Sequence, residues 1–405
     1  MALRPWSGIR PDRNRPPEPA SRRSAPTIAV YIAFATNGLM YAALVSRVPA
    51  LGAVLALPTS ELGLLLLCLS AGALSGLPTA GVLVQRFGGG RGITGGMAIA
   101  TAGLLLLAGG TETGSRSVTA VGLFVVGLGM GIWEVSMNVV GSRTSHLLGT
   151  ESLLPRLHAT LSLGTVAGAV LGALAAAAAL PLSTQNVCVA ALLVPMGILI
   201  GRMVRKGDAG RTRDEPALRG ALLASWREPR TLLIGLCILG FALAEGTANE
   251  WLAYVLVDGY GTSEEIGAFS FAAFVTAMTA GRLVGGPLAT RFGRALLLRA
   301  SACVALTGVL VVALGDTVPW AMAGALLWGA GAAMGFPVGI AAAGDDPTRA
   351  AARVSVVSSL GYAAFLGGPP LLGLLGGLFG IQQAILIVCL ALLLAFVTAG
   401  ATRRR

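Results

Sequence analysis

81-GVLVQRFGGGR-91 and 286-GPLATRFGRA-295 are two versions of one segment, and they indicate that the chain is built from two related halves. Glycine, three residues, a polar residue and then Arg-Phe-Gly recur at one offset in both copies. A second pair supports the duplication, because SLGTVAGAVLGAL from Ser162 resembles SLGYAAFLGGPPLLG from Ser359. The sequence therefore predicts two parallel halves that share one plan.

The composition predicts a membrane protein. Of 405 residues, 55% are hydrophobic and only 12% are charged, with a mean hydropathy of +0.79; soluble chains carry about 25% charged residues. Apolar runs of about 18 residues or more are typical of membrane-spanning helices. The runs lie at about 27–46, 61–85, 92–109, 118–140, 157–180, 184–203, 231–257, 264–289, 295–314, 318–341, 351–378 and 381–400. The predicted fold is an all-α membrane protein with twelve transmembrane helices in two six-helix pseudo-symmetric halves.

The expected organisation follows from these runs. We expect a disordered cytoplasmic tail over 1–26, because that stretch is rich in Arg and Pro and has no apolar core. The N-terminal half covers 27–203 and the C-terminal half 231–400. A charged cytoplasmic linker over 204–230 joins them, and 401–405 forms a short cytoplasmic tail.

The arginines predict the orientation. The tails and alternate connections carry nearly all of the 29 Lys and Arg residues, whereas the other connections hold Arg47 and Arg116 alone. Basic residues stay on the cytoplasmic side of a membrane, so both termini are expected in the cytoplasm. The net charge of +11 then reflects topology and does not indicate nucleic acid binding. The preference for Arg over Lys suggests a bacterial source, which places the protein in the bacterial cytoplasmic membrane as a multi-pass protein.

The repeated glycine and arginine pattern resembles the signature of the major facilitator superfamily, over about 27–400. In that family the fifth position of the motif is usually Asp, whereas here it is Gln85 and Thr290. The resemblance implies a loop that latches the halves together on the cytoplasmic side. The departure removes both carboxylates of such a latch, and the expected gating residues are the remaining arginines Arg86, Arg291 and Arg294.

Glu134 lies inside an otherwise apolar run of more than twenty residues, in 133-WEVSMN-138. A charged carboxylate at a helix centre costs about 3 kcal/mol or more to insert, so it must face the protein interior, be protonated or have a partner. One interpretation is a proton-coupling residue; the other is a hydrogen bond that fastens two helices. Asn138 is four residues on and shares its face, and Trp133 is adjacent, so both are candidate substrate-binding residues.

The segment also resembles the fourth helix of the fucose permease branch of the superfamily, where a Glu four residues before an Asn carries proton coupling. Poorly characterised bacterial members match at three further places in this chain. These are SRVP at 46–49, HATLSLG at 158–164 and EGTANEW at 245–251. The resemblance implies a proton-coupling role for Glu134.

The seventh predicted helix carries a second polar group. Glu245 and Asn249 share a face, whereas Glu250 points about 140° away from Glu245. We expect Glu245 to take part in proton coupling, with Asn249, Glu250 and Trp251 binding substrate. Arg47, at the outer end of the first helix, is a candidate gating residue that could contact Glu250; solvation at the helix end is the alternative.

Several other polar or aromatic residues fall within spans. The remaining candidate substrate-binding residues are Asn37, Tyr41, Ser162 and Trp328, with helix–helix hydrogen bonds or packing as the alternative. His158 is a candidate gating residue near the cytoplasmic end. Arg282 lies inside a span and is expected to extend its guanidinium toward the cytoplasm.

These patterns favour a secondary active transporter that moves a small polar solute, sugar-like or another metabolite, by proton-coupled symport and alternating access. The alternative is a proton-coupled antiporter that exports a drug or secondary metabolite; its usual Gly-Pro-x-x-Gly-Gly is absent at 168–173. A sensor with this fold that binds ligand without net flux is a third possibility. No GxxxxGK[ST] loop is present to bind ATP, and we expect no enzymatic activity, cofactor or metal. The expected partners are the solute, protons and the lipid bilayer, and the expected state is a monomer.

Overall fold

The computed structural model describes residues 20–148, 153–204, 222–346 and 349–403, and the described residues form helices without a strand. The predicted all-α membrane fold is confirmed, with twelve helical segments long and apolar enough to cross a membrane. In chain order the elements are α1 (Ala20–Val45), α2 (Val48–Val54), α3 (Thr59–Phe87), α4 (Gly89–Glu112), α5 (Arg116–Leu148), α6 (Leu153–Ala177), α7 (Leu182–Met203), α9 (Pro229–Tyr254), the π-helix η1 (Val255–Gly259), α10 (Glu264–Phe292), α11 (Arg294–Leu314), α12 (Val318–Ala332), α13 (Gly335–Ala343), α14 (Ala350–Phe379), α15 (Ile381–Ala384), α16 (Ile387–Thr398) and the 3₁₀ helix η2 (Ala399–Thr402).

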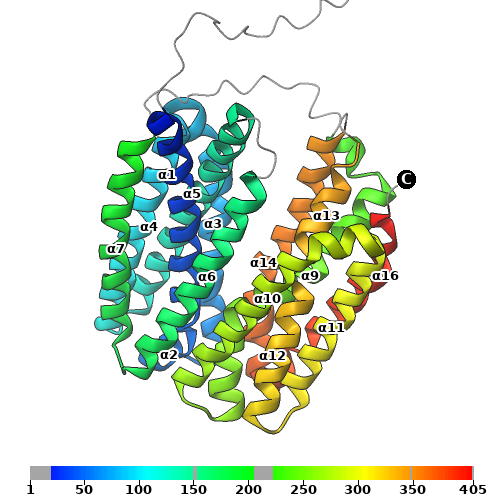
Figure 1. Cartoon of the computed structure of the whole chain (residues 1–405). Helices are drawn as coiled ribbons and strands as arrows, with labels where there is room; N and C mark the ends of the chain where they lie inside the picture. The colour runs from blue at the N-terminus through cyan, green and yellow to red at the C-terminus, as the bar shows by residue number, and fades with distance from the viewer. Residues whose placement is uncertain (1–19, 149–152, 205–221, 347–348, 404–405) are drawn as a thin grey trace, which may run out of the picture.

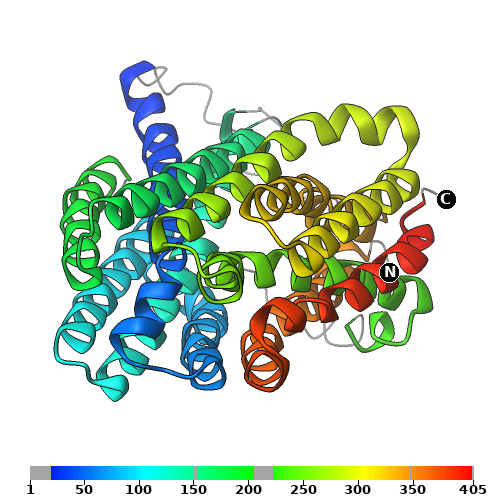
Figure 2. The same ribbon diagram turned by 90° about the horizontal axis from the view of Figure 1, so that it is seen from below.

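The helices gather into two bundles. In the first half α5 packs on α3 and α4, and α1 packs on α6; in the second half α12 packs on α10 and α11, and α14 packs on α9. Figure 1 shows the two bundles side by side, diverging toward the upper end, where the chain begins and ends, and meeting at the lower end. We call the upper end the terminal end and the lower end the far end. Seen from the far end, the first half lies beside the second across one interface (Figure 2).

The duplicated segment has the same backbone in both halves. Gly88 ends α3 with φ 87°, and Gly293 ends α10 with φ 81°. This left-handed conformation is readily adopted by glycine and disfavoured for residues with a Cβ, so each helix can end and reverse within one residue. The two motifs are therefore equivalent turns at the terminal end.

The helix ends differ from the expected spans in two ways. α1 begins at Ala20, although its membrane-spanning part begins at Thr27, so the expectation of disorder over 1–26 is wrong for residues 20–26. Hydropathy reports where the membrane segment begins, and a helix can continue beyond it. Residues 1–19 and most of the predicted linker, 205–221, lie outside the described residues. The short helix α2 was not predicted; it follows the first span after the turn at Ser46 and Arg47.

The far end is where the two halves touch most closely. α3 crosses α14 there, and a Cβ placed on Gly63 would lie 2.6 Å from the carbonyl oxygen of Pro369 and 2.8 Å from the Cα of Gly373. Thr59 and Tyr254 approach each other across the interface with their hydroxyl oxygens 3.3 Å apart. Small residues let two backbones approach this closely within a membrane. We call this contact between the halves the far-end seam.

Candidate functional site

A group of polar side chains lies at mid-membrane between the two halves. α1 supplies Tyr41, which lies within electrostatic reach of Glu134 from α5 and of Glu245 and Glu250 from α9. The four side chains therefore bring both halves to one place. Because charged and polar groups in the membrane interior mark substrate and ion pathways, this set is the candidate site, and we call it the central cluster.

Arg282 of α10 is the cation of the central cluster. Its Nη2 donates to Oε1 of Glu245 at 3.0 Å, and its Nη1 donates to Oγ of Ser162 at 3.2 Å. The expectation that Arg282 extends toward the cytoplasm is wrong, because the carboxylate on the neighbouring helix holds it within the span. Ser162 belongs to α6 of the first half, so Arg282 links the two halves.

Glu134 is in a different situation from Glu245. Its side chain keeps part of its surface exposed, and its carboxylate makes no hydrogen bond or ion pair with another described residue. Tyr362 of α14 lies within electrostatic reach of it from the second half. The amide of Asn138 does not contact this carboxylate; it donates to the backbone carbonyl of Glu134 at 2.9 Å. One N–H of the Asn138 amide is therefore engaged within its own helix.

The side of the cluster nearer the far end is more enclosed. Glu250 is 5% exposed, and Ser70 of α3 donates to its Oε1 at 3.5 Å across the halves. Asn249 is 8% exposed and lies beside Tyr41. Asn37 is 6% exposed, and its amide nitrogen has no hydrogen-bond partner among the described residues. A polar ligand could satisfy this donor, which is otherwise buried at a cost.

Exposure rises from the far-end side of the cluster toward the terminal end. Glu250 and Asn37 are buried, Glu134 and Arg282 are half-buried, and His158, on the first two turns of α6, is exposed. His158 packs edge-on against Phe34 with ring centroids 5.3 Å apart. Polar side chains in a span avoid lipid, so this gradient indicates that water reaches the cluster from the terminal end.

Arg47 takes part in the far-end seam, but with a different partner from the one expected. It is 4% exposed and contacts Glu264 of α10 at 3.3 Å and Oε1 of Gln185 at 2.8 Å. The proposed contact with Glu250 is therefore wrong, because the turn into α2 directs the side chain toward α7 and α10 while Glu250 lies deeper and contacts Ser70. The ion pair still joins the two halves.

The three candidate tryptophans are packed inside the protein. Trp133, Trp251 and Trp328 are each 0% exposed, and Trp328 lies edge-on to Phe274 within the second half. Aromatic side chains supply large buried surfaces to helix packing. In this conformation none of the three indoles presents a surface to a solute, and their role in substrate binding stays a prediction.

The candidate gating arginines of the terminal end divide into two kinds. Arg86 and Arg291 are exposed, each with its guanidinium over the neighbouring phenylalanine ring at 5.3 and 5.1 Å. Arg294 instead pairs with Asp345 at 2.7 Å within the second half. The first two are equivalent positions of the duplicated motif, one in each half.

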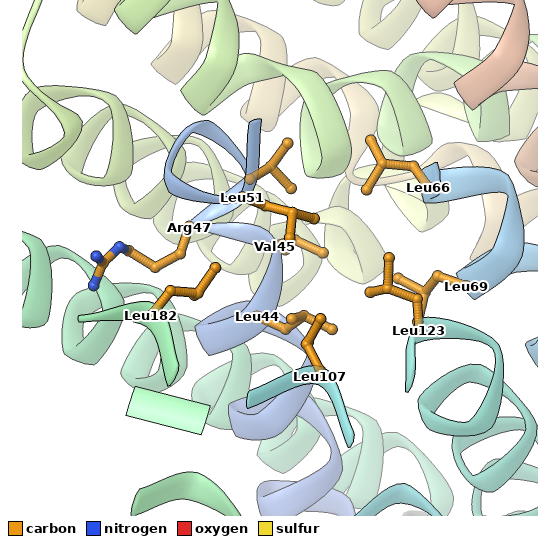
Figure 3. Close-up of a pocket in the computed structure, with 10 residues that line it drawn as sticks. Leu44, Val45, Arg47, Leu51, Leu66, Leu69, Leu107, Leu123 and Leu182 are labelled. Atoms are coloured by element: carbon orange, nitrogen blue, oxygen red, sulfur yellow. The ribbon is translucent and has the colours of Figure 1, made fainter. Parts of the chain in front are cut away.

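A small pocket in the first half is separate from the central cluster. Leucines and valines of α1 to α5 and α7 line it near the far end, and Arg47 borders it with its guanidinium directed away (Figure 3). An apolar lining offers no hydrogen bonds to a polar solute, so this pocket is not part of the candidate site. No three His, Cys, Asp or Glu side chains of the described segments gather as metal ligands would.

Sequence reasoning missed several members of the site. Ser70 and Tyr362 have no local signal, since a single hydroxyl in a span is common. Arg282 did carry a signal, because an arginine inside a span is rare and usually paired. What the sequence left open was its partner, Glu245, on a helix 37 residues away.

Comparisons with known proteins agree with this architecture. The family model described as Major Facilitator Superfamily matches residues 30–345 and 234–405. The chain is 31% identical over 379 residues to the uncharacterized transporter y4wD of Sinorhizobium fredii, covering 93% of this chain and 98% of that protein.

Two solved structures share the fold. A variant of the nucleoside transporter NupG superposes with a TM-score of 0.76 at 14% identity, over 94% of this chain and 99% of the other. The E. coli fucose:proton symporter FucP gives 0.62 at 17% identity, over 94% and 100%. With two six-helix halves, the duplicated turn and a family match along the whole span region, this chain belongs to the Major Facilitator Superfamily of transporters.

Proposed function

We propose that the protein is a proton-coupled symporter that carries a small polar solute, sugar-like or another metabolite, across the bacterial cytoplasmic membrane into the cell. The observation that carries this proposal is the central cluster, in which three glutamates from both halves lie within electrostatic reach of Tyr41 inside the membrane-spanning helices. Ionisable groups are expensive at that depth and mark ion pathways. A site between two halves that rock about it can be exposed to each side in turn.

Glu134 and Glu245 are the proposed proton-coupling residues. Glu134 has no ion partner among the described residues and keeps exposed surface, so a proton from water can neutralise it before the site closes. Glu245 is neutralised by Arg282 instead. The two carboxylates therefore give the site one group that responds directly to protons and one that responds to what Arg282 binds.

We propose that the terminal end faces the cytoplasm, and the distribution of the arginines supports this orientation. Both described termini of the helical bundle lie at that end (Figure 1), and most of the basic residues belong to its connections. With the far-end seam joined, the structure corresponds to a state that opens toward the cytoplasm. In the proposed cycle the seam parts to admit solute and proton, and the terminal end then opens to release them.

The lining supports a polar solute. Asn37, Asn249, Tyr41 and Ser162 offer amide and hydroxyl groups around the central cluster. The names of two structural relatives refer to a nucleoside and to fucose with a proton, and both kinds of solute carry several hydroxyl groups. We propose a monomer in the lipid bilayer, with solute and protons as its partners and with no enzymatic role, cofactor or nucleic acid.

The test is proton movement into proteoliposomes that enclose a pH-sensitive dye. Sugars, sugar acids, polyols and nucleosides are added outside to wild type, to Glu134→Gln and to Glu265→Gln, an exposed glutamate outside the cluster that serves as the matched control. We expect at least one solute to acidify the interior with wild type and the control, and the rate to fall at least about tenfold in Glu134→Gln, as for loss of a proton-transfer group.

Two results would contradict the proposal. Unchanged flux in Glu134→Gln would make that residue structural. Solute leaving the vesicles as protons enter would establish export by antiport.

A further inference from the structure

We propose that the solute is a carboxylic acid and that Arg282 binds its carboxylate in place of Glu245. This inference rests on the proposed function and names the substrate class of the central cluster. In the proposed exchange the incoming carboxylate takes over the guanidinium, and the released Glu245 accepts one proton. Each solute then enters the site together with a proton.

The guanidinium of Arg282 has donors to spare. It offers five N–H groups in a planar fork, and the contacts to Glu245 and Ser162 engage Nη2 and Nη1 once each. Its Nε is buried and has no hydrogen-bond partner among the described residues. Arginine in such a fork favours carboxylates, often through two parallel hydrogen bonds. Glu245 meets it through one oxygen only, so the arginine is not saturated by its present partner.

Arg282 is also one of the more exposed polar side chains of the central cluster. Its side chain is 28% exposed, against 3% for Ser162, which it contacts across the interface. The central cluster is reached from the terminal end, as the exposure of His158 indicates. An anion that reaches the central cluster from the terminal end therefore meets the partly exposed Arg282 before it meets the buried Glu250.

A purely structural pair is a poor explanation for these features. Replacing a buried ion pair by apolar residues is often neutral or stabilising, so such a pair is not needed to hold α9 against α10. Placing the pair at the interface between the halves exposes it to competition from a ligand at each turn of the cycle.

The charges around Glu245 favour a monoanion. Arg282 of α10 faces it with one positive charge, and Tyr41 of α1 lies within reach. Glu134 of α5 and Glu250 of its own helix add two carboxyl groups, Tyr362 of α14 lies near Glu134, and His158 of α6 lies near Arg282. A phosphate would bring close to two negative charges to a site with one arginine, whereas one carboxylate is matched by it.

The exchange conserves charge and changes one bond. Before binding, the Arg282 cation is balanced by the Glu245 carboxylate; afterwards it is balanced by the carboxylate of the solute. The only bond formed is the O–H bond on Glu245, with a proton taken from water at the open end. Release on the other side reverses both steps, so no oxidant, reductant or cofactor is required.

The experiment compares acids with their neutral counterparts. Purified protein in detergent is titrated with D-galacturonate against D-galactose, D-glucuronate against D-glucose and lactate against propane-1,2-diol, and thermal stability reports binding. The variants are Arg282→Gln, Arg282→Lys and Glu245→Gln, and Arg299→Gln on α11 serves as the matched control for loss of one arginine. Because Arg282→Gln leaves Glu245 unpaired, Arg282→Gln combined with Glu245→Gln provides a variant in which neither charge remains.

We expect at least one acid to stabilise wild type and Arg299→Gln while its neutral partner does not, and the effect to be lost in Arg282→Gln and in the double variant. Glu245→Gln should still bind the acid. Between about pH 6 and pH 8 the affinity of wild type for the acid should fall about tenfold more per pH unit than the affinity of Glu245→Gln. The reason is that wild type takes up one more proton when it binds the acid. Arg282→Lys should bind the acid more weakly than wild type, since it offers no planar fork.

Neutral solutes stabilising the protein as well as their acids, or acid binding that survives in the double variant, would overturn the inference. So would an unchanged pH slope in Glu245→Gln, or the absence of any acid effect. If acids bind as predicted but no proton flux accompanies them in the vesicle assay, the inference stands and the proposed symport fails. If neutral solutes drive proton flux, the symport stands and the inference fails.

Discussion

The two ends of the molecule use their polar contacts differently. At the far end, Arg47 and Glu264 pair across the halves, and Gly63 lets α3 approach α14. At the terminal end, Arg353 bonds Glu228 and Asp346, and Arg230 and Arg294 bond Asp345; all of these lie in the second half or at the start of its first helix, α9.

The difference teaches that the second half is held together as one body at the end where the halves diverge. A half that is fastened internally can rock as a unit, whereas contacts between the halves must form and break in each cycle. In the proposed cycle the far-end seam is the part that opens, and the ion pairs of the terminal end stay formed.

The largest expected effect comes from filling the seam. In Gly63→Leu a side chain must enter where a Cβ already lies 2.6 Å from the Pro369 carbonyl oxygen. Overpacking a close contact costs about 1–3 kcal/mol, so the far end should fail to close and uptake should fall by roughly tenfold or more. The control is Gly109→Leu on α4, where a Cβ would meet nothing within 4 Å.

Labelling of a cysteine at Ser60, beside the seam, provides the structural readout. All five native cysteines are unpaired in the structure, so they are first replaced. The rate of modification should rise in Gly63→Leu and stay unchanged in Gly109→Leu. Normal transport by a well-folded Gly63→Leu variant would show that the seam need not close.

A smaller effect is expected from the ion pair of the seam. In Glu264→Gln the buried Arg47 retains Gln185 and the Leu180 carbonyl, so folding should survive. Because Glu264 is 37% exposed, the loss is about 1 kcal/mol at most, or roughly a fivefold shift toward the open far end. Ser60 labelling should report this shift, and Glu265→Gln, one residue along, should not produce it. Equal labelling in the two variants would leave the ion pair without a role in closure.

The smallest effect on transport is expected at the terminal end, where Arg353 bonds Glu228. Burial raises the pKa of Glu228, but hydrogen bonds from Arg353 and Thr231 and the charges of Arg353 and Arg349 more than offset this, so the pKa lies below its usual range. A lowered pKa in the folded state stabilises the protein above the ordinary glutamate pKa of about 4.3, and this contribution is lost as the pH falls through the lowered value.

Glu228→Gln should therefore lower stability by about 1–2 kcal/mol near neutral pH, as for a charge-assisted hydrogen bond. The difference from wild type should shrink below about pH 4. Thermal unfolding of both proteins across this range measures it, with uptake by Glu228→Gln close to wild type at neutral pH. A difference in stability that grows toward acid pH would reverse the sign and contradict the assignment.

The fold could be predicted from the sequence because hydropathy and duplication act over long stretches. The twelve spans and the turns at Gly88 and Gly293 follow from patterns that each half repeats. The same local information placed Glu134 and Glu245 in their spans. It did not identify the hydrogen bonds from Arg282 to Glu245 and Ser162, because the partners of a side chain on other helices depend on how the helices rotate and pack.

The error at Arg47 has that cause. Arg47 was expected to meet Glu250, but the short helix α2 redirects it toward Glu264. Helix rotation likewise places the three candidate tryptophans in packing contacts, which their sequence positions alone did not indicate. The identity of a residue indicated its chemistry, while its direction depended on tertiary structure.

The most direct measurement of the relation between the two ends is the distance between spin labels at Arg86→Cys and Arg291→Cys, in a background without the native cysteines. These exposed positions are equivalent in the two halves and lie at the terminal end. If the halves rock, adding Gly63→Leu to hold the far end open must shorten the distance between the labels relative to the same pair with Gly63 intact, while Gly109→Leu leaves it unchanged. A distance that stays the same in folded Gly63→Leu protein would show that the far-end seam and the terminal end do not move together.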